Sequence, residues 1–248
     1  MNRQVLTPAD LSPLRIGLSP LEMDAWLRPR PGDALLLAAR RQLAEERPSE
    51  VLAVLPAGEQ PVAELAGILR ARGLPLPHTE ALPVLADLAG AVAEDLLLLT
   101  FDGSACVLSA GILCFPNRWR LVDKMGLSLT AIHGPVPDYE AALASPVDRF
   151  LERLRPGRAF TRGNWGLASS PDMHLPLPVA LVDPSADGAF YLRKEEQGFV
   201  KLPETEAVVF SIRTTVIPWS EVPEDERHAI REVAGLLSPE WRAYKSLK

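Results

Sequence analysis

The stretch from Ala207 to Ile217 constrains the fold more than any other part of the chain, because its side chains alternate between two faces. Its even-numbered positions from Val208 to Val216 share one face, and its odd-numbered positions from Val209 to Ile217 share the other. This two-residue period predicts a β-strand. The second face carries one long cation, Arg213, among small and apolar neighbours. A charge in such a place needs a partner.

Four other segments are predicted to form strands with it. Leu96–Phe101 and Ala105–Phe115 flank Asp102-Gly103, which is the strongest short hairpin signal in the chain. Arg158–Leu167 and Ala189–Glu195 follow further along. Helical patterns precede, separate and follow these segments. The chain is therefore predicted to adopt an α+β fold with an antiparallel sheet.

The first 90 residues are expected to be a mainly helical N-terminal part, packed on a core domain of residues 91–248. Residues 1–15 are interrupted by proline and predict an extended arm. Ser19-Pro20-Leu21-Glu22 has the pattern of a helix start. Helical spacing predicts longer helices over 33–46 and 60–72. Further helices are predicted from Ser145 to the Pro156-Gly157 stop, and over 121–125, 224–236 and 238–245.

Charge, cysteine content and hydropathy exclude several classes of protein. The net charge of -6, without a compensating basic face, argues against nucleic-acid binding. Two cysteines, Cys106 and Cys114, are too few for a disulfide framework, and no C-x-x-C pair exists for zinc or an iron–sulfur cluster. The N-terminal residues lack the apolar core of a signal peptide, and no apolar run approaches the ~20 residues needed to cross a bilayer. A cytoplasmic location is expected.

The segment from Cys114 to Arg149 concentrates the residues that point to chemistry. Asn117, Arg118, Trp119, Arg120 and Lys124 lie within eight residues. A single histidine, His133, then stands between an apolar run and a Gly-Pro-Val-Pro turn. Cations and an aromatic ring followed by one braced imidazole suit an anionic cofactor such as haem, held by a ring nitrogen. The alternative is a histidine satisfied by a backbone carbonyl at a helix end, and spacing alone favours that alternative.

The same segment carries a family resemblance. The motifs FPNRWRLVDKMG, AIHGPVPDY and PVDRF are similar to those of the haem-dependent oxidative N-demethylase-like proteins. The resemblance begins at residues 16–27, continues through 93–96 and ends at Tyr244-Lys245. It implies a PAS-like antiparallel sheet that holds haem b, with an added helical N-terminal part.

The resemblance implies roles for the residues of this segment. His133 would be the axial haem ligand and thus the metal ligand, with its ring direction fixed by the two following prolines. Arg118 and Lys124 would neutralise the haem propionates. Asn117 would support the loop, and Trp119 would stack on the macrocycle, although core packing is an equal alternative for Trp119.

Arg162, Asn164 and Trp165 form a second compact cluster. Together with Arg213 they are expected to line the pocket wall, with Trp165 near the cofactor and Arg162, Asn164 and Arg213 as candidate catalytic residues. Asn164 would donate a hydrogen bond to an iron-bound ligand. Arg162 and Arg213 have an alternative as partners of Glu195 or of Glu94 and Asp95, which is favoured for Arg213. Of the other histidines, His174 is a weaker candidate for the pocket, and His78 and His228 are expected on the surface.

The resemblance implies an enzyme that oxidises a methyl group of a small secondary amine, dimethylamine in the family, with O2 to give formaldehyde and a primary amine. Because the chain lacks a cysteine set and a G-x-G-x-x-G motif, a separate flavin or ferredoxin reductase subunit would have to supply electrons. The chain departs from the family pattern at Ala93, Gly163 and Glu196, which leaves the amine open. The alternatives are a non-catalytic haem-binding sensor and a cofactor-free relative with an apolar pocket.

Overall fold

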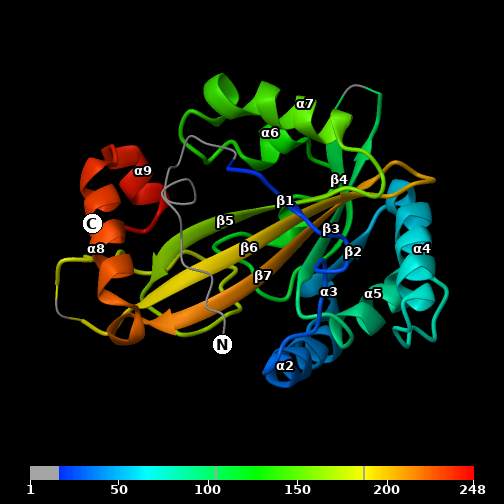
Figure 1. Cartoon of the computed structure of the whole chain (residues 1–248), viewed down its shortest axis with the longest axis horizontal. Helices are drawn as coiled ribbons and strands as arrows, with labels where there is room; N and C mark the ends of the chain where they lie inside the picture. The colour runs from blue at the N-terminus through cyan, green and yellow to red at the C-terminus, as the bar shows by residue number, and fades with distance from the viewer. Residues whose placement is uncertain (1–16, 104, 187) are drawn as a thin grey trace.

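The computed structural model describes residues 17–103, 105–186 and 188–248, so the predicted extended arm over 1–15 lies outside the described residues. Its centre is one seven-stranded antiparallel sheet in the order β1-β5-β6-β7-β3-β4-β2 (Figure 1). The strands are β1 (Ser19–Leu21), β2 (Leu52–Val54), β3 (Asp95–Phe101), β4 (Cys106–Ile112), β5 (Ala159–Ala168), β6 (Tyr191–Lys201) and β7 (Val208–Pro218).

The five predicted strands are all present as β3 to β7. Strand β7, which has the clearest alternation, lies in the middle of the sheet and pairs with both β6 and β3. Asp102 and Gly103 join β3 to β4, and Gly103 has the positive φ of 91° that its turn requires. Strand β6 continues to Lys201, well past the predicted end at Glu195, because Glu195, Gln197 and Phe199 keep alternating onto one face.

The helices gather at three places around the sheet (Figure 1). Helices α2 (Asp33–Glu46), α3 (Pro48–Val51), α4 (Pro56–Ala71) and α5 (Ala81–Ala89) come first in the chain. Helices α6 (Leu129–Ile132) and α7 (Ser145–Arg153), with the 3-10 turn η1 (Leu121–Asp123) and the π-helix η2 (Tyr139–Ala144), form the second group. Turn η3 (Trp219–Glu221) and helices α8 (Glu224–Leu236) and α9 (Pro239–Tyr244) form the third, at the end of the sheet where β5 and β7 finish.

The predicted helix at Ser19 was wrong, because residues 19–21 form the edge strand β1. Its backbone pairs with Thr161, Phe160 and Ala159 of β5. Pro20 has no N–H to donate, and an edge strand tolerates that loss. The pairing partner lies far away in sequence, so the local capping pattern was misleading here.

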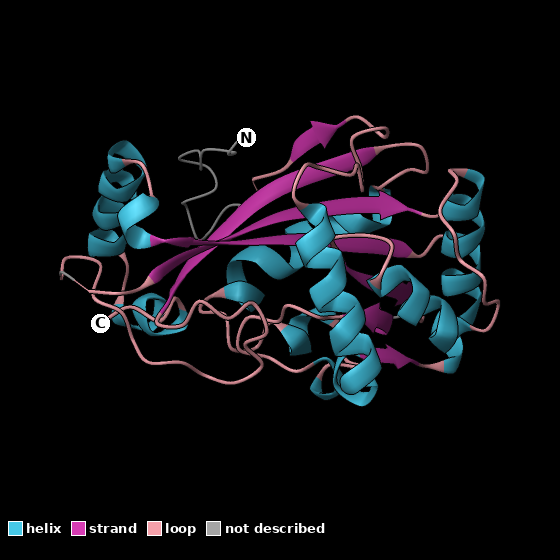
Figure 2. Cartoon of the chain, turned by 90° about the horizontal axis from the view of Figure 1, so that it is seen from below, coloured by secondary structure: helices cyan, strands magenta, loops and turns pink. Residues whose placement is uncertain are grey.

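The N-terminal residues are built into the sheet as well as packed on it. Strands β1 and β2 form its two edges, and α4 and α5 supply most of the core on one face, around Leu65, Val84 and Leu96. Helix α2 is joined to the sheet by a fully buried ion pair between Arg40 and Asp95. In Figure 2 the long strands fan out from the end that carries the C-terminus toward this helical end.

The opposite face of the sheet packs against α6 and α7 through a second apolar cluster that includes Leu97, Leu151 and Phe210. A third cluster, around Trp219 and Ile230, seats α8 against the far end of β5–β7. Within the described residues, no helix combines the length and the apolar character that spanning a membrane demands.

Candidate functional site

The face of the sheet that packs on α6, η2 and α7 borders a cavity of about 810 Å³, here called the central cavity. This volume falls within the roughly 300–1,000 Å³ that ligand sites usually have. The strands contribute a floor of alternate residues, and the loop after β4, helices α6 and α7, and the end of α9 contribute the walls. The floor residues are Leu97, Leu99, Leu108, Arg162, Asn164, Glu195, Gln197, Phe199, Phe210 and Ile212.

His133 lies on the cavity wall directly after α6. Its Nδ1 is 2.8 Å from the carbonyl oxygen of Leu129, one turn earlier. Because a carbonyl only accepts, Nδ1 must carry the proton, which leaves the lone pair on Nε2. The ring is also stacked on Tyr139, with centroids 4.3 Å apart and planes 11° apart. Burial lowers the pKa of His133, which keeps the imidazole neutral.

Spacing alone favoured a histidine whose ring is hydrogen-bonded to a backbone carbonyl at a helix end, and His133 makes such a hydrogen bond. That contact uses one nitrogen only. A histidine that binds a metal usually donates its other N–H to just such an acceptor, which fixes the tautomer. The same hydrogen bond leaves the lone pair on Nε2, which is the tautomer that a metal ligand through Nε2 requires.

Several of the residues that line the cavity are cations. Lys124 donates from Nζ to the carbonyl of Ile132 at 3.0 Å and so ties the loop after β4 to the end of α6. Arg118 has a positive φ of 64° and lies 5.8 Å from the centroid of the Tyr244 ring. Its guanidinium contacts Ser246, and burial lowers its pKa. An anion in the cavity would offset the free-energy cost of burying this charge.

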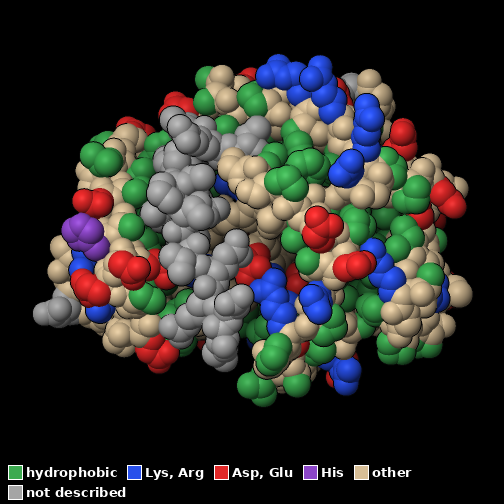
Figure 3. All heavy atoms as spheres, in the orientation of Figure 1, with side chains coloured by type: hydrophobic (Ala, Val, Ile, Leu, Met, Phe, Trp, Pro, Cys, Tyr) green, Lys and Arg blue, Asp and Glu red, His purple; other side chains and the backbone are tan. Residues whose placement is uncertain are grey.

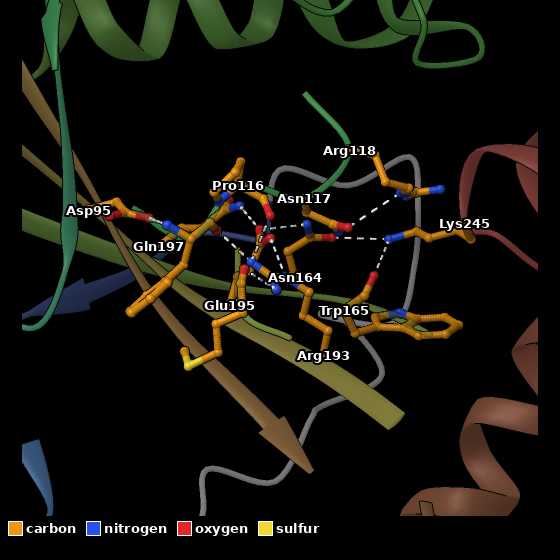
Figure 4. A network of polar contacts seen from close by, with 12 residues as sticks. Asp95, Pro116, Asn117, Arg118, Asn164, Trp165, Arg193, Glu195, Gln197 and Lys245 are labelled. Atoms are coloured by element: carbon orange, nitrogen blue, oxygen red, sulfur yellow. Dashed lines mark hydrogen bonds and ion pairs between the residues drawn. The ribbon is translucent and has the colours of Figure 1, made fainter. Parts of the chain in front are cut away.

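A polar network crosses the cavity floor from β6 to the C-terminal helix (Figure 4). The Asn164 amide donates to Glu195 at 3.0 Å, and its oxygen accepts from Lys245 at 3.0 Å. Gln197 donates to the same Glu195 oxygen at 2.9 Å. Lys245 also donates to the backbone oxygen of Trp165 at 2.7 Å. Asn164 is thus held in one orientation between a carboxylate and an amine.

The cavity brings together eight of the nine residues predicted from sequence. These are Asn117, Arg118, Trp119, Lys124, His133, Arg162, Asn164 and Trp165. Trp119 also packs against the apolar cluster beneath α7, which was its alternative role. Trp165 is almost fully buried, with 2% of its surface exposed.

Arg213 is the exception, because it is not among the described residues that line the cavity. It projects from the opposite face of β7, where its guanidinium pairs with Glu94 at 2.7 Å and with Asp33 of α2. The structural pairing offered as the alternative for Arg213 is therefore the one observed. His174 also lies apart from the cavity lining, and its Nδ1 is 2.8 Å from the carbonyl oxygen of Cys114.

Sequence reasoning missed several residues of the cavity, above all Glu195, Gln197, Tyr139 and Lys245. The alternation of Glu195, Gln197 and Phe199 was a usable signal, because it places all three on one face of a strand. Lys245 gave no such signal. It comes from the last helix, and only the folded chain brings it to Asn164.

Comparison with protein families places most of the chain in a known family. A family model described as "haem-dependent oxidative N-demethylase, alpha subunit-like" matches residues 70–248, which is well over half of the chain. The matched region includes every residue of the central cavity, from Leu97 to Lys245.

Proposed function

Because the chain belongs to the family of haem-dependent oxidative N-demethylase alpha-subunit-like proteins, we propose that its central cavity holds haem b and that His133 is the axial ligand. The observation that carries this proposal is the braced His133 ring. Its Nδ1 is committed to the carbonyl of Leu129, it is stacked on Tyr139, and it lies on the wall of the cavity.

The character of the cavity suits a porphyrin. The floor and the helical wall of the cavity are largely apolar, as the macrocycle requires. Leu97, Phe199 and Phe210 lie on the floor, and Val147 of α7 lies on the wall. The carboxylates of haem need cations, and Arg118 and Lys124 lie on the cavity wall while Arg162 lies on its floor. We take strands β3 to β7, with α6 and α7 inserted between β4 and β5, as the PAS-like domain proposed from sequence. We also propose that the protein is cytoplasmic.

The proposed reaction is oxidative demethylation of a small secondary amine. One amine, one O2, two electrons and two protons give a primary amine, formaldehyde and water. Bound haem would supply the activation of dioxygen. The chain itself must hold the amine, exclude bulk water and hold protons near the reacting atoms.

Glu195 is the residue best placed to hold the amine. A secondary amine is a cation at neutral pH, and Glu195 is the cavity carboxylate that lies on the floor rather than at the rim. Asn164 and Gln197 both donate to its Oε2, which leaves Oε1 for the ammonium. Arg193 Nε forms an ion pair with Oε1 at 3.9 Å, a distance that is too long for a hydrogen bond.

We propose that a separate reductase protein supplies the electrons and that an acidic donor docks on an exposed basic patch on and after α7. Arg149, Arg153, Arg155 and Arg158 are all exposed there, and basic side chains gather over α7 in Figure 3. The inner face of the same helix lines the cavity with Val147, Phe150 and Leu151. Docking on α7 would thus bring a donor within one helix diameter of the cavity.

Formaldehyde release tests the proposed function. The haem-loaded protein, supplied with dimethylamine, O2 and a ferredoxin–reductase system driven by NADPH, is expected to release formaldehyde. Glu195→Gln removes the charge but keeps the shape, and should raise the KM for the amine by about 10-fold or more, as loss of a charge-assisted contact of ~1.5–3 kcal/mol implies. Haem binding without any formaldehyde from a range of secondary amines would instead support the non-catalytic haem-binding alternative.

A further inference from the structure

The amine of Lys245 has no part in the proposed haem site, yet it belongs to the cavity. Lys245 follows α9 directly, is 7% exposed and lines the central cavity beside Asn164 and Trp165. Its Nζ makes two hydrogen bonds, to the side-chain oxygen of Asn164 at 3.0 Å and to the backbone oxygen of Trp165 at 2.7 Å.

Both of these acceptors are neutral. Among the described residues, no carboxylate forms an ion pair with Lys245. An ammonium group carries three N–H donors, whereas an uncharged amine carries two donors and one lone pair. The two neutral acceptors are as many as an uncharged amine can serve, and in that form the amine keeps its lone pair for reaction.

Lys194 shows how the same fold places another buried lysine beside a carboxylate. It is also buried, but its Nζ meets the carboxylate of Glu226 at 2.8 Å. A buried ammonium is stabilised by such a partner. Lys194 and Lys245 are thus a matched pair of buried lysines, one with a carboxylate and one without.

Some of the groups around Lys245 raise its pKa and others lower it. Burial is the largest influence, and together with the nearby guanidinium groups of Arg162 and Arg118 it lowers the pKa of Lys245 to about 7. Glu195 opposes them, and the Trp165 ring, whose centroid is 5.1 Å from Nζ, also favours the charged form. A desolvated lysine beside other cations is the usual setting of a nucleophilic amine.

We propose that Lys245 is a reactive amine that adds to small aldehydes entering the central cavity. The Nζ lone pair forms a C–N bond to the carbonyl carbon, the carbonyl π electrons move to oxygen, and a proton passes from nitrogen to that oxygen to give a carbinolamine. Loss of water then gives an imine, so the step needs no oxidant or reductant. The proposal does not depend on haem, although formaldehyde from the proposed demethylation would be such an aldehyde.

Reductive methylation of the wild-type protein tests this directly, because the chain has five lysines: Lys124, Lys194, Lys201, Lys245 and Lys248. The protein is treated with limiting formaldehyde and sodium cyanoborohydride between pH 6 and pH 9, and each lysine is followed by peptide mapping. Lys245 is expected to be methylated about 10-fold or more faster at pH 7 than the exposed Lys248, because a far larger fraction of its amine is uncharged. Lys194 should remain unmodified.

Two further measurements make the result decisive. The methylation rate of Lys245 should level off above about pH 7, whereas that of Lys248 should keep rising toward pH 9. Lys245→Arg should lose the fast-reacting site and leave the other four lysines unchanged. Labelling of Lys124 and Lys248 ahead of Lys245, or equal slow labelling of Lys194 and Lys245, would overturn the proposal.

Discussion

Replacing Arg40 by Met should destabilise the whole protein, although Arg40 lies outside the residues matched by the family model. Arg40 is fully buried in α2, and its guanidinium pairs with Asp95 at the start of β3. The Asp95 carboxylate also accepts backbone N–H groups of Cys114 at 2.8 Å and Phe115 at 2.9 Å. Three segments of the chain therefore meet at one buried carboxylate.

The magnitude follows from what the substitution leaves behind. Met fills much of the arginine stem, so little packing is lost, but Asp95 becomes a buried anion without its cation. Breaking a buried pair in this way costs about 3–5 kcal/mol. The two remaining backbone donors favour the lower end, so we expect a loss of about 3 kcal/mol. For a chain of this size that corresponds to a fall in Tm of roughly 6–12 °C.

Thermal and urea unfolding followed by circular dichroism would measure this loss. Arg41→Met is the matched control, because Arg41 is the next residue of the same helix and is exposed; we expect less than about 0.5 kcal/mol. The double variant Arg40→Met/Asp95→Asn should cost less than the sum of the single variants. If Arg40→Met were no more damaging than Arg41→Met, helix α2 would not be part of the cooperative fold.

Three further predictions concern packing, pH dependence and the histidine. Gly198→Ala should lower the free energy of unfolding by about 1–3 kcal/mol, because an added Cβ would lie 2.5 Å from Ser211 Oγ; urea unfolding checks this. The pKa of Lys245 is about 7 in the folded state and near ~10.4 in the unfolded state. At pH values between these two, the folded state therefore binds fewer protons than the unfolded state. Wild-type stability, relative to Lys245→Met, should therefore rise by roughly 2–3 kcal/mol from pH 6 to pH 9, and a flat difference would refute the shift. Tyr139→Ala removes the ring stacked on His133 and should weaken haem binding about 10-fold in a titration, whereas an unchanged affinity would show that the ring does not orient His133.

The sequence predicted those parts of the fold whose signals are local. The alternation of β7 and the Asp102-Gly103 turn between β3 and β4 are signals of this kind. Strand β1 could not be found in this way, because residues 19–21 carry a helix-capping pattern and become a strand only by meeting the edge of β5. Helix α5 was also missed, because Ala81–Ala89 is short, largely apolar and contains Pro83.

The sequence predicted the proximity of site residues where those residues are close together in the chain. The motifs placed His133, Arg118 and Lys124 near one another because they share one short segment. Arg213 was harder, because its face depends on the register between strands. It lies opposite Glu196, whereas Arg162 lies opposite Gln197, so the two arginines point to opposite sides of the sheet. No property of either strand alone reveals that register.

Haem titration with histidine variants tests the central claim most directly. Wild-type protein, titrated with haem under an absorption spectrometer, should bind one equivalent and develop a shifted Soret band. His133→Ala should lose that shift and bind haem far more weakly. His174→Ala, which alters a histidine outside the cavity lining, should behave like the wild type. A His133→Ala variant with the wild-type spectrum and affinity, or a wild-type protein that binds no haem, would contradict the assignment of His133 and of the cavity.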